Sequence, residues 1–442
     1  MERRMELVNL YVEAIHDKPH TLFHPPTLVR QAEDGSLPPK ILYSVLAMAA
    51  RVCKDPAVRQ LSAGFVELAV EKLKPEIDDI SLETIQALVL LGNLYGGGGN
   101  NHAEALYFGI AFRMAQILHL PIGSSSDNEI VKETKIRVFW SLYMADLWSS
   151  AGHDLPRQMR ASDSFLLPMD ELQFDQLQLG SHYLETSRPG LWGRMIQLVH
   201  VFRDIQDLHR KYVDCGMNDA DIEATTWRLS APLDDFIQSL PENVQLREEN
   251  IQEHAKKGLG PAFVALHLGY HHYSTLLYFH YLDLRLEQSA TVTSFASKCR
   301  HHAAAYSDLL RLSWTIPRCK TVYFIVAHMI VVSSATLLHT LLFGEQSELL
   351  QARQRLEFNF EALVEMRQYW PAVEQLMERL FIFQRACMWK ANQNTHKADR
   401  WMVMFLLQHA LPVPEKYPGQ GEMYTVRDEY ADDAMAILRD AE

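Results

Sequence analysis

Two histidines four residues apart are the first candidates for chemistry in this chain. His267 and His271 lie in a run with helical periodicity, so both imidazoles could face one metal ion. A catalytic zinc site also needs a third ligand and an acidic partner nearby. The surrounding residues are instead typical of a packing face: Leu266, Leu268, Tyr270, Tyr273, Leu276, Leu277 and Tyr278. We therefore expect hydrogen-bonded core histidines and no metal ion here.

His16, His20 and His24 also repeat every four residues. Pro19 and Pro25 interrupt the helix that would align their side chains, because proline breaks a helix interior. We expect no shared helical face and no metal site at these positions.

The four consecutive glycines 96–99 resemble a phosphate-binding loop only at first sight. A P-loop ends in Lys followed by Ser or Thr, and a dinucleotide fingerprint follows a strand. Here Asn100, Asn101 and His102 follow the glycines, and a predicted helix precedes them. The glycines therefore predict a loop between two helices, without a role in nucleotide binding.

Motifs for nucleophilic, zinc-dependent or phosphoryl-transfer catalysis (G-x-S-x-G, H-E-x-x-H, the kinase set) do not occur in the sequence. The acidic pairs 78–79 and 234–235 are expected at helix edges, where solvation or capping explains them. The cysteines are widely spaced and form no C-x-x-C motif, which indicates reduced, mostly buried thiols of a cytosolic or nuclear protein: Cys53, Cys215, Cys299, Cys319 and Cys387. No cofactor is expected.

The charge balance argues against contact with nucleic acid. Lys and Arg number 42 against 55 Asp and Glu, so the formal net charge is −13. Phosphate contacts require clustered cations, and we expect no DNA-binding residues in this chain. The most apolar stretch, residues 323–343, contains His328 and His339, so we interpret it as a buried core helix rather than a membrane span.

Helical periodicity extends over almost the whole chain. Ser81 is a good N-cap for a helix over 82–95, and 103–120 resumes the pattern after the glycines, which predicts an antiparallel pair. A long helix is expected over 129–150, and further helical runs begin after the Pro-containing stretch 152–188. The sequence predicts an all-α fold, a large bundle of about a dozen antiparallel-packed helices.

Prolines and glycines beyond residue 411 predict a flexible connector to a short acidic C-terminal segment. Acidic residues such as Asp432 and Asp433 alternate there with apolar ones such as Met435 and Leu438. This composition could dock into a groove of a coactivator, or it could form a terminal helix that packs on the body. We expect the second arrangement.

Three blocks of helical sequence carry a family resemblance. The first comprises residues 10–16, 22–24 and 41–51, and the second residues 81–91 and 107–120. The third, residues 135–146 (KIRVFWSLYMAD), is similar to a helix with the pattern R-x-x-W-W-x-L-Y-x-x-D-R. Together they resemble the regulatory "middle homology" region of fungal binuclear zinc-cluster transcription factors, closely over residues 7–165 and more loosely in later helices such as 266–282.

The resemblance implies a helical regulatory region that gates an attached DNA-binding module, in some members in response to a small molecule. The sequence departs from the family at Leu147, where an Arg is usual, and in the turn 152–156. The family's N-terminal cluster of six cysteines, which binds zinc and DNA, is missing from this sequence. If a ligand pocket exists, the resemblance points to polar groups of the second and third blocks: Tyr107, Arg113, Trp140, Tyr143 and Asp146. The structural alternative is that Arg113 or Arg137 pairs with Asp146 and the aromatic rings fill the core.

These observations predict a fungal transcription regulator, nuclear or shuttling to the cytoplasm, whose helical domain controls gene expression without its own DNA-binding module. The expected partners are transcription machinery or co-regulator proteins and a small-molecule effector, with no nucleic acid and no membrane. The expected division is 1–165 and 166–410 for two halves of the regulatory domain, and 411–442 for the connector and tail. We expect no enzymatic activity. The alternative is that the same scaffold serves as a secondary-metabolism enzyme of the cyclisation or isomerisation type, with an apolar pocket.

Overall fold

The computed structural model describes residues 2–18, 20–178, 180, 189–391, 399–415 and 426–439. The chain forms two compact units. Unit 1 comprises residues 1–196 together with Tyr369–Pro371, and unit 2 comprises Gln197–Gln368 and Ala372–Glu442. The three-part division expected from the sequence stays a prediction, because a compact unit of contacts need not be a domain that folds alone.

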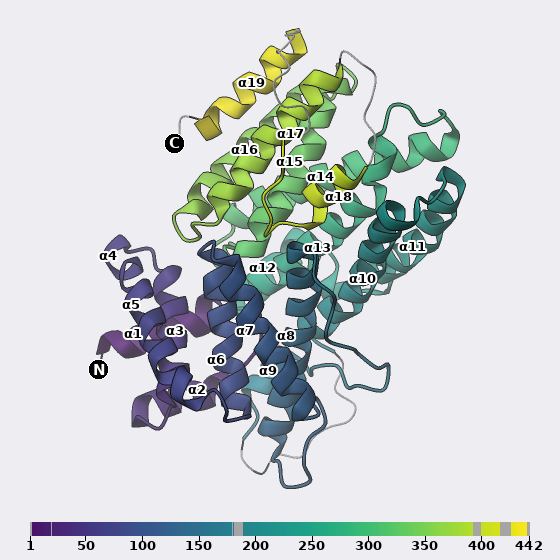
Figure 1. Cartoon of the computed structure of the whole chain (residues 1–442). Helices are drawn as coiled ribbons and strands as arrows, with labels where there is room; N and C mark the ends of the chain where they lie inside the picture. Colours follow the sequence, from purple (N-terminus) through teal and green to yellow (C-terminus); the bar gives the residue numbers. More distant parts are fainter. Residues whose placement is uncertain are drawn as a thin grey trace. The chain divides into compact units, whose positions relative to one another are not determined.

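The described residues form helices joined by loops, and they contain two isolated β-bridges but no strand. The all-α prediction is therefore confirmed. Short helices such as α4 and α9 raise the number of helices above the expected dozen or so. Unit 1 contains α1 (Glu2–Ala14), α2 (Pro25–Asp34), α3 (Pro39–Arg51), α4 (Pro56–Arg59), α5 (Leu61–Leu73), η1 (Lys74–Glu76), α6 (Leu82–Gly97), α7 (Asn101–Ile117), α8 (Glu129–His153), α9 (Glu171–Asp175) and the first residues of α10 (Leu191–Cys215) (Figure 1).

Unit 2 continues α10 and holds the later helices. These are α11 (Asp219–Ser239), η2 (Glu242–Val244), α12 (Glu248–Lys256), α13 (Gly260–Tyr278), η3 (Phe279–Leu282), α14 (Ala290–Thr315), α15 (Phe324–Phe343), α16 (Leu349–Arg367), α17 (Val373–Ala391), α18 (Arg400–Leu407) and α19 (Val426–Arg439).

Polar side chains cap the starts of α6, α7 and α8 in unit 1, and the cap at Ser81 was predicted. The Ser81 Oγ accepts a hydrogen bond from the Thr84 N–H at 3.3 Å at the start of α6. Asn100 and Asn128 cap α7 and α8 in the same manner. Each cap satisfies a backbone donor that has no partner within its helix. The predicted antiparallel pair is confirmed, because α6 and α7 pack closely and only three residues join them.

The core of unit 2 surrounds α15. This helix is long and apolar enough to cross a membrane, but 94 % of its most apolar window is buried within the structure. α15 packs against α14, α16 and α17, which confirms the expected core helix.

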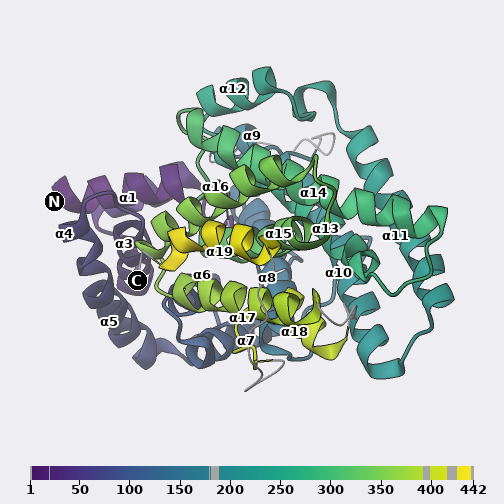
Figure 2. The same cartoon turned by 90° about the horizontal axis from the view of Figure 1, so that it is seen from above.

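The C-terminal helix packs on the body of unit 2. α19 lies along α16, as Figures 1 and 2 show. Ala431, Ala434, Met435 and Leu438 are fully buried there. The Gln384 amide also donates a hydrogen bond to Asp432 at 2.8 Å. The expectation of a terminal helix packed on the body is confirmed for these residues, whereas Glu422 to Tyr424 lie outside the described part.

Candidate functional site

A buried network of charged side chains forms the centre of unit 1. The Arg137 guanidinium, on α8, is fully buried. It donates hydrogen bonds to Glu133 Oε1 at 2.9 Å, to Thr21 Oγ1 at 3.1 Å and to the Met169 carbonyl at 2.7 Å. It also lies 4.2 Å from the centre of the Phe174 ring. One side chain thus joins three segments that are far apart in the sequence.

The turn after α1 completes this network. Asp17, in a left-handed conformation (φ 60°), places its Oδ1 3.3 Å from His16 Nε2 and 3.5 Å from Arg137 Nη1. The Tyr11 hydroxyl lies 3.0 Å from His20 Nε2. Burial lowers the pKa of His16 to about 4 and that of His20 to about 3, so both imidazoles are neutral at pH 7. His16, His20 and His24 lie between α1 and α2 and share no helical face, but the turn still gathers His16 and His20 in the core.

Glu171, on α9, ties the same region to the start of α10. Its carboxylate accepts hydrogen bonds from the Leu191 N–H at 3.0 Å and the Trp192 N–H at 2.8 Å. An anion is favourable at a helix N-terminus. Burial raises the Glu171 pKa to about 7. A Cβ at position 190 would lie 2.3 Å from the carboxylate, so Gly190 allows this close approach.

Three of the five predicted ligand residues are buried and hydrogen-bonded or packed within the chain. The Trp140 indole N–H donates to the Leu166 carbonyl at 2.8 Å, and its ring meets that of Tyr143 edge-to-face at 5.5 Å. Asp146 accepts hydrogen bonds from the backbone N–H groups of Gln158 at 2.8 Å and Met159 at 2.7 Å. Burial raises the Asp146 pKa. These contacts hold the segment after α8 against the helix.

The expected ion pair of Asp146 with Arg113 or Arg137 is wrong. Arg137 pairs with Glu133 in the buried network, and Arg113 is exposed on α7. Asp146 is satisfied by backbone donors, which no pattern of residue types reveals. Tyr107, also on α7, stacks on Tyr95 with ring centres 5.2 Å apart. The structure thus places Trp140 against Tyr143. Of the five predicted ligand residues, Tyr107 and Arg113 have solvent-accessible side chains. Ligand binding by the five residues stays a prediction.

An open depression on unit 1, the α7 groove, has a cavity volume of about 510 Å³. One wall is α7 and another is the segment that precedes α6. The lining residues are Ile77, Asp78, Ile80, Ala105, Leu106, Gly109, Ile110, Arg113, Met114, Ile117 and Gln158. Arg113 is therefore the predicted ligand residue that faces a sizeable cavity.

The glycine run ends α6 rather than beginning after it. α6 extends to Gly97, and the reason is packing: a Cβ at Gly96 would lie 2.6 Å from Glu104 Oε2, and one at Gly97 would lie 2.2 Å from the Trp370 ring. The absence of a Cβ at Gly96 and Gly97 thus allows the Glu104 carboxyl group and the Trp370 indole to pack directly against the backbone of α6. The predicted loop is confined to the residues between Gly97 and α7.

Glu104 is the acid that this glycine pair accommodates. Its Oε2 is buried without a hydrogen-bond partner among the described residues and lies 3.7 Å from His153 Nε2. Burial raises the Glu104 pKa from 4.5 to about 8. The carboxyl group is therefore protonated in the folded chain at neutral pH.

We expect the Glu104→Gln variant to gain stability over the wild type as pH rises from about 4.5 to about 8. Folded Glu104 keeps its proton through this window while the unfolded chain loses it. The folded state therefore binds more protons, and the wild type loses roughly 1.4 kcal/mol per pH unit that the neutral glutamine does not lose. Urea denaturation at pH 5 and pH 8.5 measures this. Glu67→Gln, at an exposed position, is the control, and equal pH dependence of all three proteins would contradict the assignment.

His267 and His271 of unit 2 make hydrogen bonds in the core as expected. His267 Nε2 lies 2.9 Å from the Val244 carbonyl, and His271 Nδ1 lies 3.0 Å from His302 Nδ1. Burial lowers the pKa of His267 to about 4. Within the described ranges, His, Cys, Asp and Glu form no group of three or more that could hold a metal ion.

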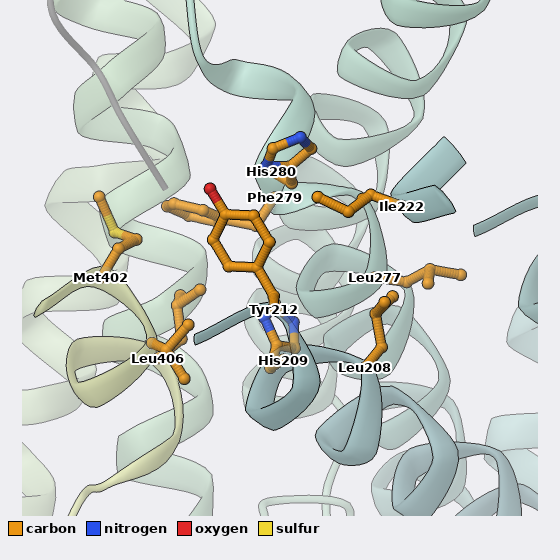
Figure 3. Close-up of a pocket in the computed structure, with 10 residues that line it drawn as sticks. Leu208, His209, Tyr212, Ile222, Leu277, Phe279, His280, Met402 and Leu406 are labelled. Atoms are coloured by element: carbon orange, nitrogen blue, oxygen red, sulfur yellow. The ribbon is translucent and has the colours of Figure 1, made fainter. Parts of the chain in front are cut away.

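A small apolar cavity of about 20 Å³ lies in unit 2 between α10, α13 and α18 (Figure 3). The Tyr212 ring lies beside Met402 and Leu406 of α18 in this view. The neighbouring His209 bonds the Leu276 carbonyl at 3.1 Å, and burial lowers its pKa to about 4. A volume of this size holds about one water molecule. The cavity therefore does not favour the alternative of an enzyme with an apolar substrate pocket.

Comparison with known proteins connects this architecture to a family. Residues 8–201 match the model of the fungal specific transcription factor domain. A Zn(2)-C6 fungal-type transcription factor of Fusarium oxysporum f. sp. lycopersici is 28 % identical over 188 residues, which cover 38 % of this chain and 17 % of the relative. An uncharacterised transcriptional regulatory protein of Schizosaccharomyces pombe is 24 % identical over 320 residues, which cover 62 % of this chain and 32 % of the relative.

A further Zn(2)-C6 fungal-type transcription factor of the same Fusarium is 24 % identical over 443 residues, which cover 86 % of this chain and 45 % of the relative. The chain thus spans less than half the length of these relatives. The matched domain contains the buried Arg137 network, Glu104 and the α7 groove. Over residues 8–201 this chain is therefore similar to the fungal specific transcription factor domain, and more widely it is similar to Zn(2)-C6 fungal transcription factors and another transcriptional regulatory protein.

Proposed function

We propose that this chain regulates transcription in the nucleus by binding other proteins. The observation that carries the proposal is the match of residues 8–201 to the fungal specific transcription factor domain. Relatives that are transcription factors and regulatory proteins support it over a wider part of the chain. The partners we propose are co-regulators or components of the transcription machinery.

Charge supports a role through protein contacts. A net charge of −13 repels a phosphate backbone at long range, so the helical body is suited to control a DNA-bound protein rather than to bind DNA itself. The cavity of unit 2 is small, and three buried acids of unit 1, Glu133, Asp146 and Glu171, accept hydrogen bonds from the chain's own backbone. We propose a regulatory role without catalysis on these grounds.

A small-molecule effector belongs to the same proposal. Among the five residues that the sequence indicates, Tyr107 and Arg113 could touch a ligand without opening the core. Trp140, Tyr143 and Asp146 would then act behind them, by holding α8 and the segment that follows it.

The experiment is a reporter assay in a fungal host. The full chain is fused to a DNA-binding domain of known site and to a fluorescent tag, so that location and transcription are read in the same cells. We expect nuclear signal from the tagged chain without the fusion domain, and at least a severalfold change in reporter transcription with it. The variant Arg137→Met, which removes the centre of the network, should lose the effect. An unchanged reporter with folded, nuclear fusion protein would overturn the proposal.

A further inference from the structure

The loop between α7 and α8 contains an exposed turn rich in serine, the serine turn (residues 124–127). The Asp127 N–H donates a hydrogen bond to the Ser124 carbonyl at 3.1 Å, and the Ser124 N–H donates to Asp127 Oδ2 at 2.7 Å. Ser126 lies in this turn with an exposed side chain, and its Oγ is 2.9 Å from Ser124 Oγ. The Ser126 hydroxyl is therefore held at the surface, where an enzyme can reach it.

Acidic residues follow Ser126 at the first and third positions, Asp127 and Glu129. Among the exposed serines of the described ranges, Ser126 alone has both acids. Ser162, for example, has an acid at the first position only, and Ser239 has one at the third position only. Kinases distinguish substrates by such charge patterns, because cationic side chains in a substrate groove attract carboxylates and repel basic residues. The spacing therefore favours a kinase that selects acidic residues after its acceptor serine, which we call an acid-directed kinase.

Two lysines of α8 reach back to the serine turn. Lys135 Nζ lies 2.6 Å from Asp127 Oδ2, and Lys132 Nζ lies 2.7 Å from Glu129 Oε1. A phosphate on Ser126 would add a charge of about −1.5 to −2 beside Asp127 at neutral pH. The folded chain thus already supplies, next to the turn, the cations that offset a phosphate.

We propose that Ser126 is phosphorylated by an acid-directed serine/threonine kinase, and that Lys132 and Lys135 then bind the phosphate. In the transfer, Ser126 Oγ forms a bond to the γ-phosphorus of ATP while the bond from that phosphorus to the bridging oxygen of ADP breaks. ADP leaves, and the hydroxyl proton passes to the catalytic aspartate of the kinase. Glu129 is the first residue of α8, and helix ends fray, so a kinase can take the stretch after Ser126 in extended form. This site does not depend on the proposed regulatory role.

Phosphorylation is tested on the purified full chain. It is incubated with radiolabelled ATP and, separately, with kinases that select acidic, basic or proline-containing sequences, and tandem mass spectrometry locates the phosphate. We expect the acid-directed kinase to place a single phosphate on Ser126, at least about tenfold faster than the other kinases modify that residue. Ser126→Ala should lose this phosphate, whereas Ser239→Ala, at an exposed serine with only one of the two acids, should keep it.

Removing one recognition charge separates the acidic pattern from mere exposure. Glu129→Gln should lower the rate of phosphorylation at Ser126 at least about fivefold. Glu67→Gln, at an exposed position outside the turn, should leave that rate unchanged. Unchanged thermal midpoints show that the variants are folded. Phosphate on another serine in place of Ser126, no phosphate on the folded chain, or a rate indifferent to Glu129→Gln would overturn the proposal.

Phosphorus NMR of the phosphorylated chain tests the two lysines. Nearby cations favour the doubly charged phosphate, so the phosphate should lose its second proton at lower pH in the wild type than in Lys132→Gln or Lys135→Gln. Lys54→Gln, at an exposed lysine of another loop, should titrate as the wild type does. Equal titration of all four chains would overturn the binding of the phosphate by the lysines.

Discussion

Replacing Arg137 by methionine is expected to lower the free energy of unfolding of unit 1 by about 3–5 kcal/mol. The substitution removes the guanidinium that bonds Glu133, Thr21 and the Met169 carbonyl, and it leaves the Glu133 carboxylate buried without its cation. Desolvation of an unpaired buried charge is the main cost. Native-state hydrogen exchange of the α8 amides measures the loss within unit 1 itself.

Two further variants separate charge from packing. Arg137→Met combined with Glu133→Gln removes both charges, while the amide oxygen can still accept the hydrogen bond from the Met169 N–H, which is 2.9 Å in the wild type. We expect this double variant to be more stable than Arg137→Met alone. Arg228→Met, at an exposed arginine, should change stability by less than about 0.5 kcal/mol. Equal losses for the single and double variants would show that the ionic pairing is not what matters.

Gly97→Ala is expected to destabilise unit 1 by about 1–3 kcal/mol, although alanine is the better helix former. The new Cβ would lie 2.2 Å from Trp370 Cε3 and 2.7 Å from Cζ3. Trp370 is buried and also lies 5.9 Å from the Arg51 guanidinium, measured to the ring centre, so the indole cannot move freely. The midpoint of thermal unfolding measures the effect.

Gly64→Ala is the matched control for this substitution. Gly64 lies within α5 and a Cβ there would meet nothing within 4 Å. Its replacement should stabilise the chain by up to about 1 kcal/mol, because alanine has the higher helix propensity. If Gly97→Ala raised the midpoint as Gly64→Ala does, the close packing of Trp370 on α6 would be refuted.

Helices and their pairing could be predicted because the signals are local. Periodicity near 3.6 residues, the cap Ser81 and the short glycine turn each act within a few residues, and the structure places α6 and α7 accordingly. The buried character of α15 followed from its composition in the same way, since two histidines within an apolar run indicate a protein core.

The contacts of the site residues could not be predicted from the sequence in this way, because their partners are distant in the sequence or belong to the backbone. Arg137 has one local partner, Glu133 at four residues, whereas Asp17, Thr21 and Met169 come from other segments. Asp146 is held by two backbone N–H groups that any residue type except proline could provide. The glycines 96 and 97 are explained by Glu104 and Trp370, and the second of these lies in a different part of the sequence.

Unit 1 has a consequence for the timing of synthesis. Its last continuous residue is Ile196, but the tripeptide Tyr369–Pro371 that fills the hollow over Gly97 is made 175 residues later. At roughly 5–20 residues per second, the ribosome needs about 9–35 s to reach it. During that interval the nascent unit 1 lacks Trp370, so the surface of α6 at Gly97 is uncovered and chaperones can bind there. A chain truncated before residue 369 would stay in this incomplete state.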